Sequence, residues 1–505
     1  MVAMARSLLA VAASTGAAAD PSQLPPGLFP TLLRRILLLL CVGYGFCLLA
    51  RTNMSIAQLQ MAGDLELSEA SFGAAASAFF LSYTALQVPA NYVITRVGPT
   101  RALAAYVICW GLVSAAHGLV SSSRQLVVLR VLLGVAESGY YPGCIYYMTR
   151  WFPKQVSAQV IALFLSGSVV LTSLMTGTSG LLMDSLDGVA GMRGWRWLFI
   201  LQGLPCVPLG LCFLLLLDET PKPVAWLQPH ERMWLADNCS EAQGQSKSEL
   251  SLVESLRRLL SLRSTWTLGL SWVSLTTSSY VGAFFFPVIT KDILPEWSAS
   301  AISAFTLLPT AIRLGFNPVI ARWADHGSSR RKVVVAWGFP ATNKLCMTLI
   351  SVPLLVANLQ GLAGTSAGLL YWVLASFVIV WIVESDGVLW ALHHRHQPAE
   401  LLPISIAVIN TFGQLGGLLG PYLFGLLHDS SQACPAVTPS CPAEWGAPLV
   451  VLYGGTFALT TATGLAALAL GFARDEPAVE PAPDLQKGRV SKGKGFLRRP
   501  SMRLF

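Results

Sequence analysis

Charged residues are scarce in this sequence: they make up 12% of its 505 residues, whereas hydrophobic residues make up 53%. A soluble globular protein carries roughly 25% charged residues. The deficit excludes an ordinary soluble domain, because too few charges remain to cover a water-exposed surface of this size. It points instead to a chain whose surface largely faces lipid.

The sequence motifs of catalysis and nucleotide binding are also missing. We find no Gly-rich phosphate-cradling loop, no HExxH pattern and no nucleophile elbow. We therefore predict that the chain is not an enzyme, that it carries no cofactor and that it has no internal ATP-driven motor. The histidine-rich stretch HHRH at 393–396 follows an apolar run, and we interpret it as a solvated loop rather than a metal site.

Long apolar runs recur along most of the chain. A run of roughly 20 residues is long enough to cross the hydrocarbon core as a helix, whereas a membrane barrel would show alternating segments of about ten residues. The sequence therefore predicts an all-α membrane protein with about twelve spans. They lie near 36–58, 71–94, 102–120, 125–149, 156–183, 196–217, 266–290, 299–321, 333–357, 367–391, 402–427 and 447–472.

The basic residues predict the orientation of these spans, because Lys and Arg are retained in cytoplasmic loops. One set of loops, together with both chain ends, holds most of them, and the opposite loops hold only Arg124, Arg193, Arg196 and Lys291. Both termini are therefore expected in the cytoplasm. The same bias explains most of the net charge of +8, so we expect contact with anionic lipid headgroups rather than nucleic acid.

The chain divides into segments of different composition. We expect an N-terminal tail (1–33), a six-helix bundle (34–217), a polar central loop (218–264), a second six-helix bundle (265–473) and a basic disordered tail (474–505). The first tail is either a disordered cytoplasmic segment or a targeting peptide.

Two stretches of the sequence are similar to each other: SGLLMDS at 179–185 and FGLLHDS at 424–430 end the fifth and eleventh spans. Corresponding positions in two halves are typical of transporters built from a duplicated unit, with the site between the halves.

Most of the ten cysteines lie in apolar spans, where a thiol behaves as a small hydrophobic group. Cys434 and Cys441 instead flank a short segment in a non-cytoplasmic loop, where a disulfide can form. We therefore predict a bridge between them. We expect a monomer in the plasma membrane, with an organelle membrane as the alternative.

Two charged residues stand inside the fourth apolar run, where lipid should exclude them. Arg130 and Glu137 are seven residues apart in RVLLGVAESGYYPG, which places them on one helix face about 10 Å apart along the axis. Gly134 between them leaves room for a ligand or a neighbouring helix. Either the pair is part of a transport pathway, with Glu137 taking up and releasing a proton, or it is an ion pair that only holds the bundle together.

Further charges interrupt other spans. Arg51 in the first span suits a carboxylate through two parallel hydrogen bonds, or else it snorkels to the membrane surface or pairs with Glu137. In the second half, Arg313, Lys344, Glu384 and Asp386 also lie in apolar runs and could face a common cavity. The slight basic excess in these spans favours an anionic substrate, although mutual pairing of the second set is an equally open interpretation.

At this point the sequence resembles the major facilitator superfamily and, within it, the anion:cation symporter family. The resemblance covers about residues 36–473 and is carried by several motifs in order. They are DLELSEASFGAAASAFFLSYTALQVPANYVITRVGPTR (64–101), RVLLGVAESGYYPGCIYYMTRWFPK (130–154), LDGVAGMRGWRWLFILQGLPCVPLG (186–210), ARWADHGSSRRK (321–332) and INTFGQLGGLLGPYLFGLLHD (409–429). The first three look most like the fungal and bacterial allantoate, nicotinate, phthalate and sugar-acid permeases.

The resemblance implies proton-driven symport of organic anions by alternating access. It implies that Arg51 contacts the substrate carboxylate, that Glu137 is a coupled protonation site with Arg130 as its partner, and that Asn410 lines the cavity. It also implies a cytoplasmic gate. The gate residues are Arg96, Arg101, Asp325, Arg330 and Arg331.

Two departures from the family pattern bear on proton coupling. Ala50 stands where many proton-coupled members have an Asp, and Thr95 stands where the gate loop usually has an acid. We therefore hypothesise that Glu384 or Asp386 takes over part of the lost proton-carrying role. A proton-independent exchanger or facilitative carrier is the alternative function, and a non-transporting membrane sensor is a third.

Overall fold

The computed structural model describes residues 25–220, 224, 226–239, 252–308, 323, 328–356, 386–398, 401–430 and 443–473. Within these ranges the chain forms helices and no strand. Eight helical stretches are long and apolar enough to cross a membrane. The predicted spans at 71–94 and 125–149 are also helical, and most of 299–321 and 367–391 lies outside the described residues.

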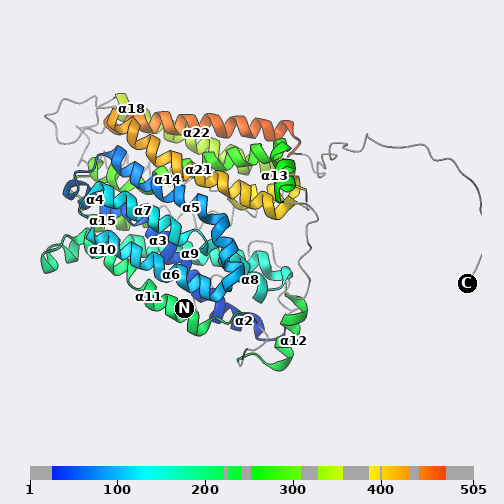
Figure 1. Ribbon diagram of the computed structural model, residues 1–505. Helices are drawn as coiled ribbons and strands as arrows, with labels where there is room; N and C mark the ends of the chain where they lie inside the picture. Colours follow the sequence, from blue (N-terminus) through cyan, green and yellow to red (C-terminus); the bar gives the residue numbers. More distant parts are fainter. Residues whose placement is uncertain are drawn as a thin grey trace, which may run out of the picture.

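The first half of the chain forms a bundle of long helices, shown in the lower part of Figure 1. Serine side chains begin several helices by accepting a bond from the third backbone N–H of the helix, as Ser68 and Ser122 do. The main helices are α3 (Leu38–Thr52), α4 (Met54–Asp64), α5 (Glu69–Val97), α6 (Pro99–Ala116), α7 (Ser123–Glu137), α8 (Tyr140–Trp151), α9 (Lys154–Leu186), α10 (Gly194–Gly203) and α11 (Cys206–Leu216). Short helical turns precede α3, at Leu28–Leu32 (α2) and Leu33–Leu37.

The second half lies above the first in Figure 1. Between the halves, the predicted central loop contains two short helices, α12 (Pro229–Asn238) and α13 (Leu252–Ser261). The helices of the second half are α14 (Arg263–Ile293), α15 (Ala299–Phe305), α17 (Ser329–Val333), α18 (Phe339–Val356), α20 (Asp386–His396), α21 (Leu402–Ser430) and α22 (Ala443–Ala469). Across the halves, α5 packs on α21, α9 on α15 and α4 on α14.

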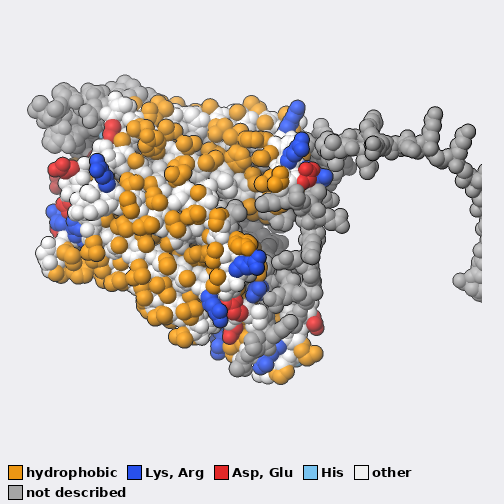
Figure 2. Space-filling model, in the orientation of Figure 1, with side chains coloured by type: hydrophobic (Ala, Val, Ile, Leu, Met, Phe, Trp, Pro, Cys, Tyr) orange, Lys and Arg blue, Asp and Glu red, His pale blue; other side chains and the backbone are white. Residues whose placement is uncertain are grey.

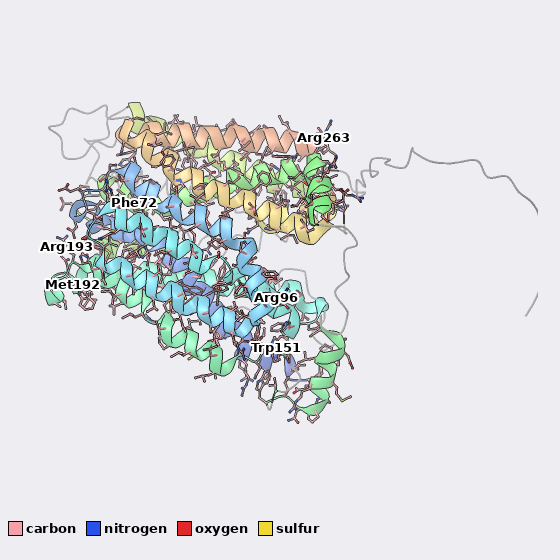
Figure 3. The ribbon with its side chains drawn as sticks, in the orientation of Figure 1. Phe72, Arg96, Trp151, Met192, Arg193 and Arg263 are labelled. Atoms are coloured by element: carbon pink, nitrogen blue, oxygen red, sulfur yellow. The ribbon has the colours of Figure 1, made fainter. Side chains whose placement is uncertain are left out.

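The surface of the molecule has an apolar middle and charged ends. Figure 2 shows hydrophobic side chains over the central band, with Lys, Arg, Asp and Glu gathered toward the two ends. Figure 3 places Met192 and Arg193 at one end and Arg96, Trp151 and Arg263 at the other. By the predicted orientation, the end with Arg96 is cytoplasmic and the end with Arg193 is the outer end.

A glycine allows α7 to lie directly against α5. A Cβ atom on Gly134 would stand 2.3 Å from the carbonyl oxygen of Phe79 and 2.2 Å from the hydroxyl oxygen of Ser82. The space that this glycine leaves between Arg130 and Glu137 is therefore occupied by a neighbouring helix. This is one of the two occupants that the sequence analysis considered.

Gly134→Ala is expected to lower the melting temperature of the purified protein, because the Phe79 carbonyl belongs to a helix backbone and cannot yield. Overpacking of this kind costs about 1–3 kcal/mol. Gly455→Ala on α22 is the matched control, since a Cβ there meets nothing within 4 Å. Thermal unfolding of both variants in one detergent checks the prediction, and equal melting temperatures would contradict it.

Candidate functional site

The charged residues of the first and fourth spans meet in the interior of the first half. Arg51, in the last turn of α3, places its Nε atom 2.7 Å from Oε2 of Glu137 at the end of α7. Both side chains are buried, with 5% and 0% of their surfaces exposed. The structure therefore pairs Glu137 with Arg51, which was the alternative interpretation of Arg51.

Three uncharged side chains complete the surroundings of this ion pair. The Cys47 thiol donates to the same Oε2 atom of Glu137 across 3.2 Å, one helical turn before Arg51. The Arg51 guanidinium lies over the ring of Tyr83, 4.5 Å from its centroid, and 5.2 Å from that of Phe79. Aromatic faces attract a cation and cover it with apolar surface. The pair is thus held in place from α3, α5 and α7.

Arg130 makes its polar contacts with α3 and α4. Its Nε atom lies 3.0 Å from the sulfur of Met54, and one terminal nitrogen donates to the carbonyl oxygens of Ala50 and Arg51, each at 3.3 Å. These carbonyls belong to the last turn of α3, where a helix leaves acceptors unused and favours a positive charge. These contacts join Arg130 to the junction between α3 and α4, and its predicted roles as partner of Glu137 and in substrate binding stay predictions.

Several buried polar atoms of this region have no hydrogen-bond partner among the described residues. They are Oε1 of Glu137, the second terminal nitrogen of Arg130 and both amide atoms of Asn53. Asn53 separates α3 from α4 and is fully buried. Buried polar groups are normally satisfied, so a group of them indicates where a polar ligand can bind. The unpartnered nitrogen of Arg130 and the unpartnered oxygen of Glu137 can offer a donor and an acceptor to a small polar solute.

Of the charged residues predicted to group in the second half, the structure describes the side chain of Lys344. Lys344 on α18 is 1% exposed and donates to the hydroxyls of Ser274 (2.8 Å) and Thr460 (2.7 Å), between α14 and α22. Arg313 and Glu384 lie outside the described residues, and Asp386 begins α20 with its side chain likewise outside them. The predicted grouping of these residues thus stays a prediction.

The remaining predicted site residues are spread over both halves. Asn410 lies on α21 and is partly buried. Arg96, Arg101, Arg330 and Arg331 are exposed at helix ends, and the Arg331 guanidinium lies 5.6 Å from the ring centroid of Trp323. Asp325, Cys434 and Cys441 lie outside the described residues. The cytoplasmic gate and the disulfide therefore stay predictions.

One prediction about histidines is wrong. The HHRH stretch forms the end of α20 instead of a solvated loop, with His393 1% exposed and His396 8% exposed. His393 contacts the hydroxyl of Ser405 across 2.7 Å, and His396 stacks on Phe472. The described residues contain no group of three His, Cys, Asp or Glu side chains that could hold a metal ion.

Sequence reasoning missed Cys47, Met54, Phe79 and Tyr83 as neighbours of the charged pair. In the sequence, each resembles an ordinary apolar residue of a membrane helix. For Cys47 a signal existed, because it precedes Arg51 by four residues and so shares its helix face. For the aromatic residues no local spacing could have linked them to Arg51, since they come from another helix.

Comparisons with known proteins agree with this architecture. The family model described as Major Facilitator Superfamily matches residues 40–421. A protein of Agrobacterium vitis named as a tartrate transporter is 30% identical over 400 residues, which is 79% of this chain and 84% of that protein. The metabolite transport protein NicT of Pseudomonas putida is 30% identical over 422 residues, 83% of this chain and 92% of its own.

A solved structure shares the fold. A bacterial homolog of the human lysosomal transporter Spinster, in an inward-facing conformation, aligns with a TM-score of 0.65 at 16% identity. The alignment covers 88% of this chain and 98% of that one.

Proposed function

This chain belongs to the Major Facilitator Superfamily, and we propose on that premise that it couples the uptake of a small organic anion to a proton through Glu137. It is a multi-pass integral membrane transporter and not an enzyme. The substrate class, the proton and the roles of individual residues are the proposal. One relative is named as a tartrate transporter, and the guanidinium of Arg51 suits a carboxylate of that kind.

The observation that carries the proposal is the buried contact between Arg51 and Glu137, 2.7 Å long. A guanidinium binds a carboxylate by two parallel hydrogen bonds. In the ion pair, the carboxylate of Glu137 occupies part of that capacity. A substrate carboxylate therefore competes with Glu137 for Arg51.

Protonation of Glu137 resolves this competition. The protonated side chain no longer neutralises Arg51, so the guanidinium becomes free to bind the anion. The unpartnered oxygen of Glu137 can hydrogen-bond the same solute. One proton taken up by Glu137 thus permits one carboxylate to bind, and release of both restores the ion pair.

Alternating access turns this exchange into transport. A substrate and a proton that bind from the acidic side leave on the cytoplasmic side, where the lower proton concentration returns Glu137 to its pairing with Arg51. The alternative, proton-independent exchange of anions, is favoured by Ala50, because an acid common in proton-coupled members is replaced there. A sensor with little flux is a weaker alternative.

Uptake by proteoliposomes tests the proposal. We expect radiolabelled tartrate, nicotinate or a sugar acid to accumulate when the outside is acidic, and to equilibrate without a gradient. One proton per monovalent anion permits roughly tenfold accumulation per pH unit, because each factor of ten corresponds to about 1.4 kcal/mol. Uptake that ignores the gradient but is stimulated by internal anion would favour the exchanger.

A further inference from the structure

The two echoed segments of the sequence lie at corresponding ends of two helices. Gly180–Asp184 (GLLMD) ends α9 in the first half, and Gly425–Asp429 (GLLHD) ends α21 in the second. Both segments lie at the outer end of the molecule, on the side of Met192 in Figure 3. The mechanism proposed above uses neither of them.

Each segment docks on the other half of the protein. A Cβ atom on Gly425 would stand 2.3 Å from the carbonyl oxygen of Glu69, so the helices touch backbone to backbone. One turn later, Oδ2 of Asp429 accepts the backbone N–H of Ala70 across 3.1 Å. Gly425 permits the close approach of the two helices, and Asp429 stabilises it through this hydrogen bond.

The first half repeats this contact with the roles of the halves exchanged. A Cβ atom on Gly180 would stand 2.0 Å from the carbonyl oxygen of Ala299. Oδ2 of Asp184 accepts the backbone N–H of Ser300 across 2.8 Å and also the hydroxyl of Ser300. The hydroxyl of Ser303 adds two bonds of 3.0 Å, donating to the Gly177 carbonyl and accepting the Gly180 N–H.

The receiving sites are equivalent as well. Ser68 and Ser298 are the N-caps of α5 and α15, and each accepts the N–H of the residue three positions later. The N–H two positions after each serine, on Ala70 and Ser300, would otherwise lack a partner, because the first N–H groups of a helix have none. In both halves that donor is satisfied by an aspartate of the opposite half.

These contacts differ from the other aspartate contacts at the same end. The indole of Trp195 donates to Asp64 across 2.7 Å within the first half, and that of Trp445 donates to Asp292 across 2.7 Å within the second. The hydrogen bonds of the two GLLxD segments and their receiving sites instead join one half to the other. These hydrogen bonds therefore join the two halves at the outer end.

We propose that the two GLLxD segments are a symmetric pair of outer latches, and that Asp184 and Asp429 are positioning residues that set the conformational equilibrium of transport. The latches hold the outer end closed, and both must break before the site opens to that side. The proposal rests on alternating access as proposed above. It requires neither a particular substrate nor proton coupling.

One latch carries an additional titratable group. Glu69 follows Ser68, where Ala299 follows Ser298, and it lies just outside the predicted span at 71–94. Gln58 donates to its carboxylate across 2.7 Å, while Asp292 and Asp429 repel its charge. His428 also lies at this junction, 3.4 Å from Oδ1 of Asp429. Burial, opposed by the Gln58 hydrogen bond and aided by the two aspartates, raises the pKa of Glu69 to about 7.

The sign of the resulting pH dependence follows from linkage. In the proposed opening, Glu69 becomes exposed to water and also separates from both aspartates, so its pKa falls toward the usual value of 4.5. The closed form therefore binds the proton more tightly, so acid stabilises closure. This stabilisation is complete below pH 4.5 and is lost as the pH rises through about 7.

Distance measurements between spin labels at the outer end test the proposal without any substrate. Labels on a ketone-bearing unnatural amino acid at the exposed positions Val189 and Glu296 avoid the native cysteines and report the separation of the halves. Asp184→Asn and Asp429→Asn are each expected to raise the population of the longer distance several-fold, and the double variant more. Asp64→Asn is the matched control, because its contact stays within one half.

The same distances are then measured from pH 8 to pH 6. These measurements use a Glu137→Gln background, which removes the proton site proposed for transport. Closure should increase with acid, and Glu69→Gln should abolish this dependence while Asp184→Asn retains it. If the distances in the two aspartate variants match those in Asp64→Asn, the proposed role of the GLLxD segments is wrong. Longer distances in the aspartate variants, together with a wild-type protein that shows no proton-driven uptake, would instead count against the proposed function alone.

Discussion

Replacement of Glu137 with glutamine is expected to abolish proton-driven accumulation while anion exchange across the membrane continues. Glutamine keeps the shape of the side chain but cannot take up or release a proton. Arg51 would then lack its competing carboxylate at every pH, so the substrate would bind without the help of a proton. The accumulation ratio should fall from roughly tenfold per pH unit to about one.

Binding measured at equilibrium gives a second readout of this variant. In the wild-type protein the affinity for a carboxylate should increase as the pH falls, because protons remove the competitor. In Glu137→Gln the affinity should be high and independent of pH. Glu66→Gln, at an exposed glutamate on the outer side, is the control and should behave as wild type. Retention of a normal gradient response by Glu137→Gln would sink the proposed role of Glu137.

Sequence reasoning located the charged residues well because charge is costly in a membrane span. Arg51, Arg130 and Glu137 stand out in apolar runs, and each proved to be buried in the described structure. It could not assign their partners. A spacing of seven residues fixes which face of one helix Glu137 shares with Arg130, but the carboxylate reaches across to another helix at 2.7 Å.

The same limit explains the histidines and the echoed segments. The HHRH stretch looks polar along the chain, and its burial involves contacts with Ser405, 12 residues after His393, and with Phe472, just after the end of α22. The echo of GLLMD and GLLHD was visible and was taken as a sign of duplicated halves. Its contacts join residues 116 and 359 positions apart, and only the folded chain brings these together.

Replacement of Arg51 with glutamine is expected to abolish carboxylate binding, and replacement with lysine to weaken it by about 10- to 100-fold. Lysine keeps the charge but loses the planar pair of donors that matches a carboxylate. Hydrogen bonds to charged groups contribute about 1.5–3 kcal/mol each, and about 1.4 kcal/mol corresponds to a factor of ten in affinity. Equilibrium binding of a labelled anion to purified protein at acidic pH measures both variants.

Loss of binding alone would not separate a direct role of Arg51 from a purely structural one. Arg51→Gln leaves a buried carboxylate without its partner, which costs about 3–5 kcal/mol and could distort the site. The double variant Arg51→Gln, Glu137→Gln removes both charges, and its melting temperature should recover toward that of wild type. If Arg51 holds the substrate, the stable double variant still binds no anion. If Arg51 serves only to neutralise Glu137, the double variant regains binding, and the substrate must be held by other residues.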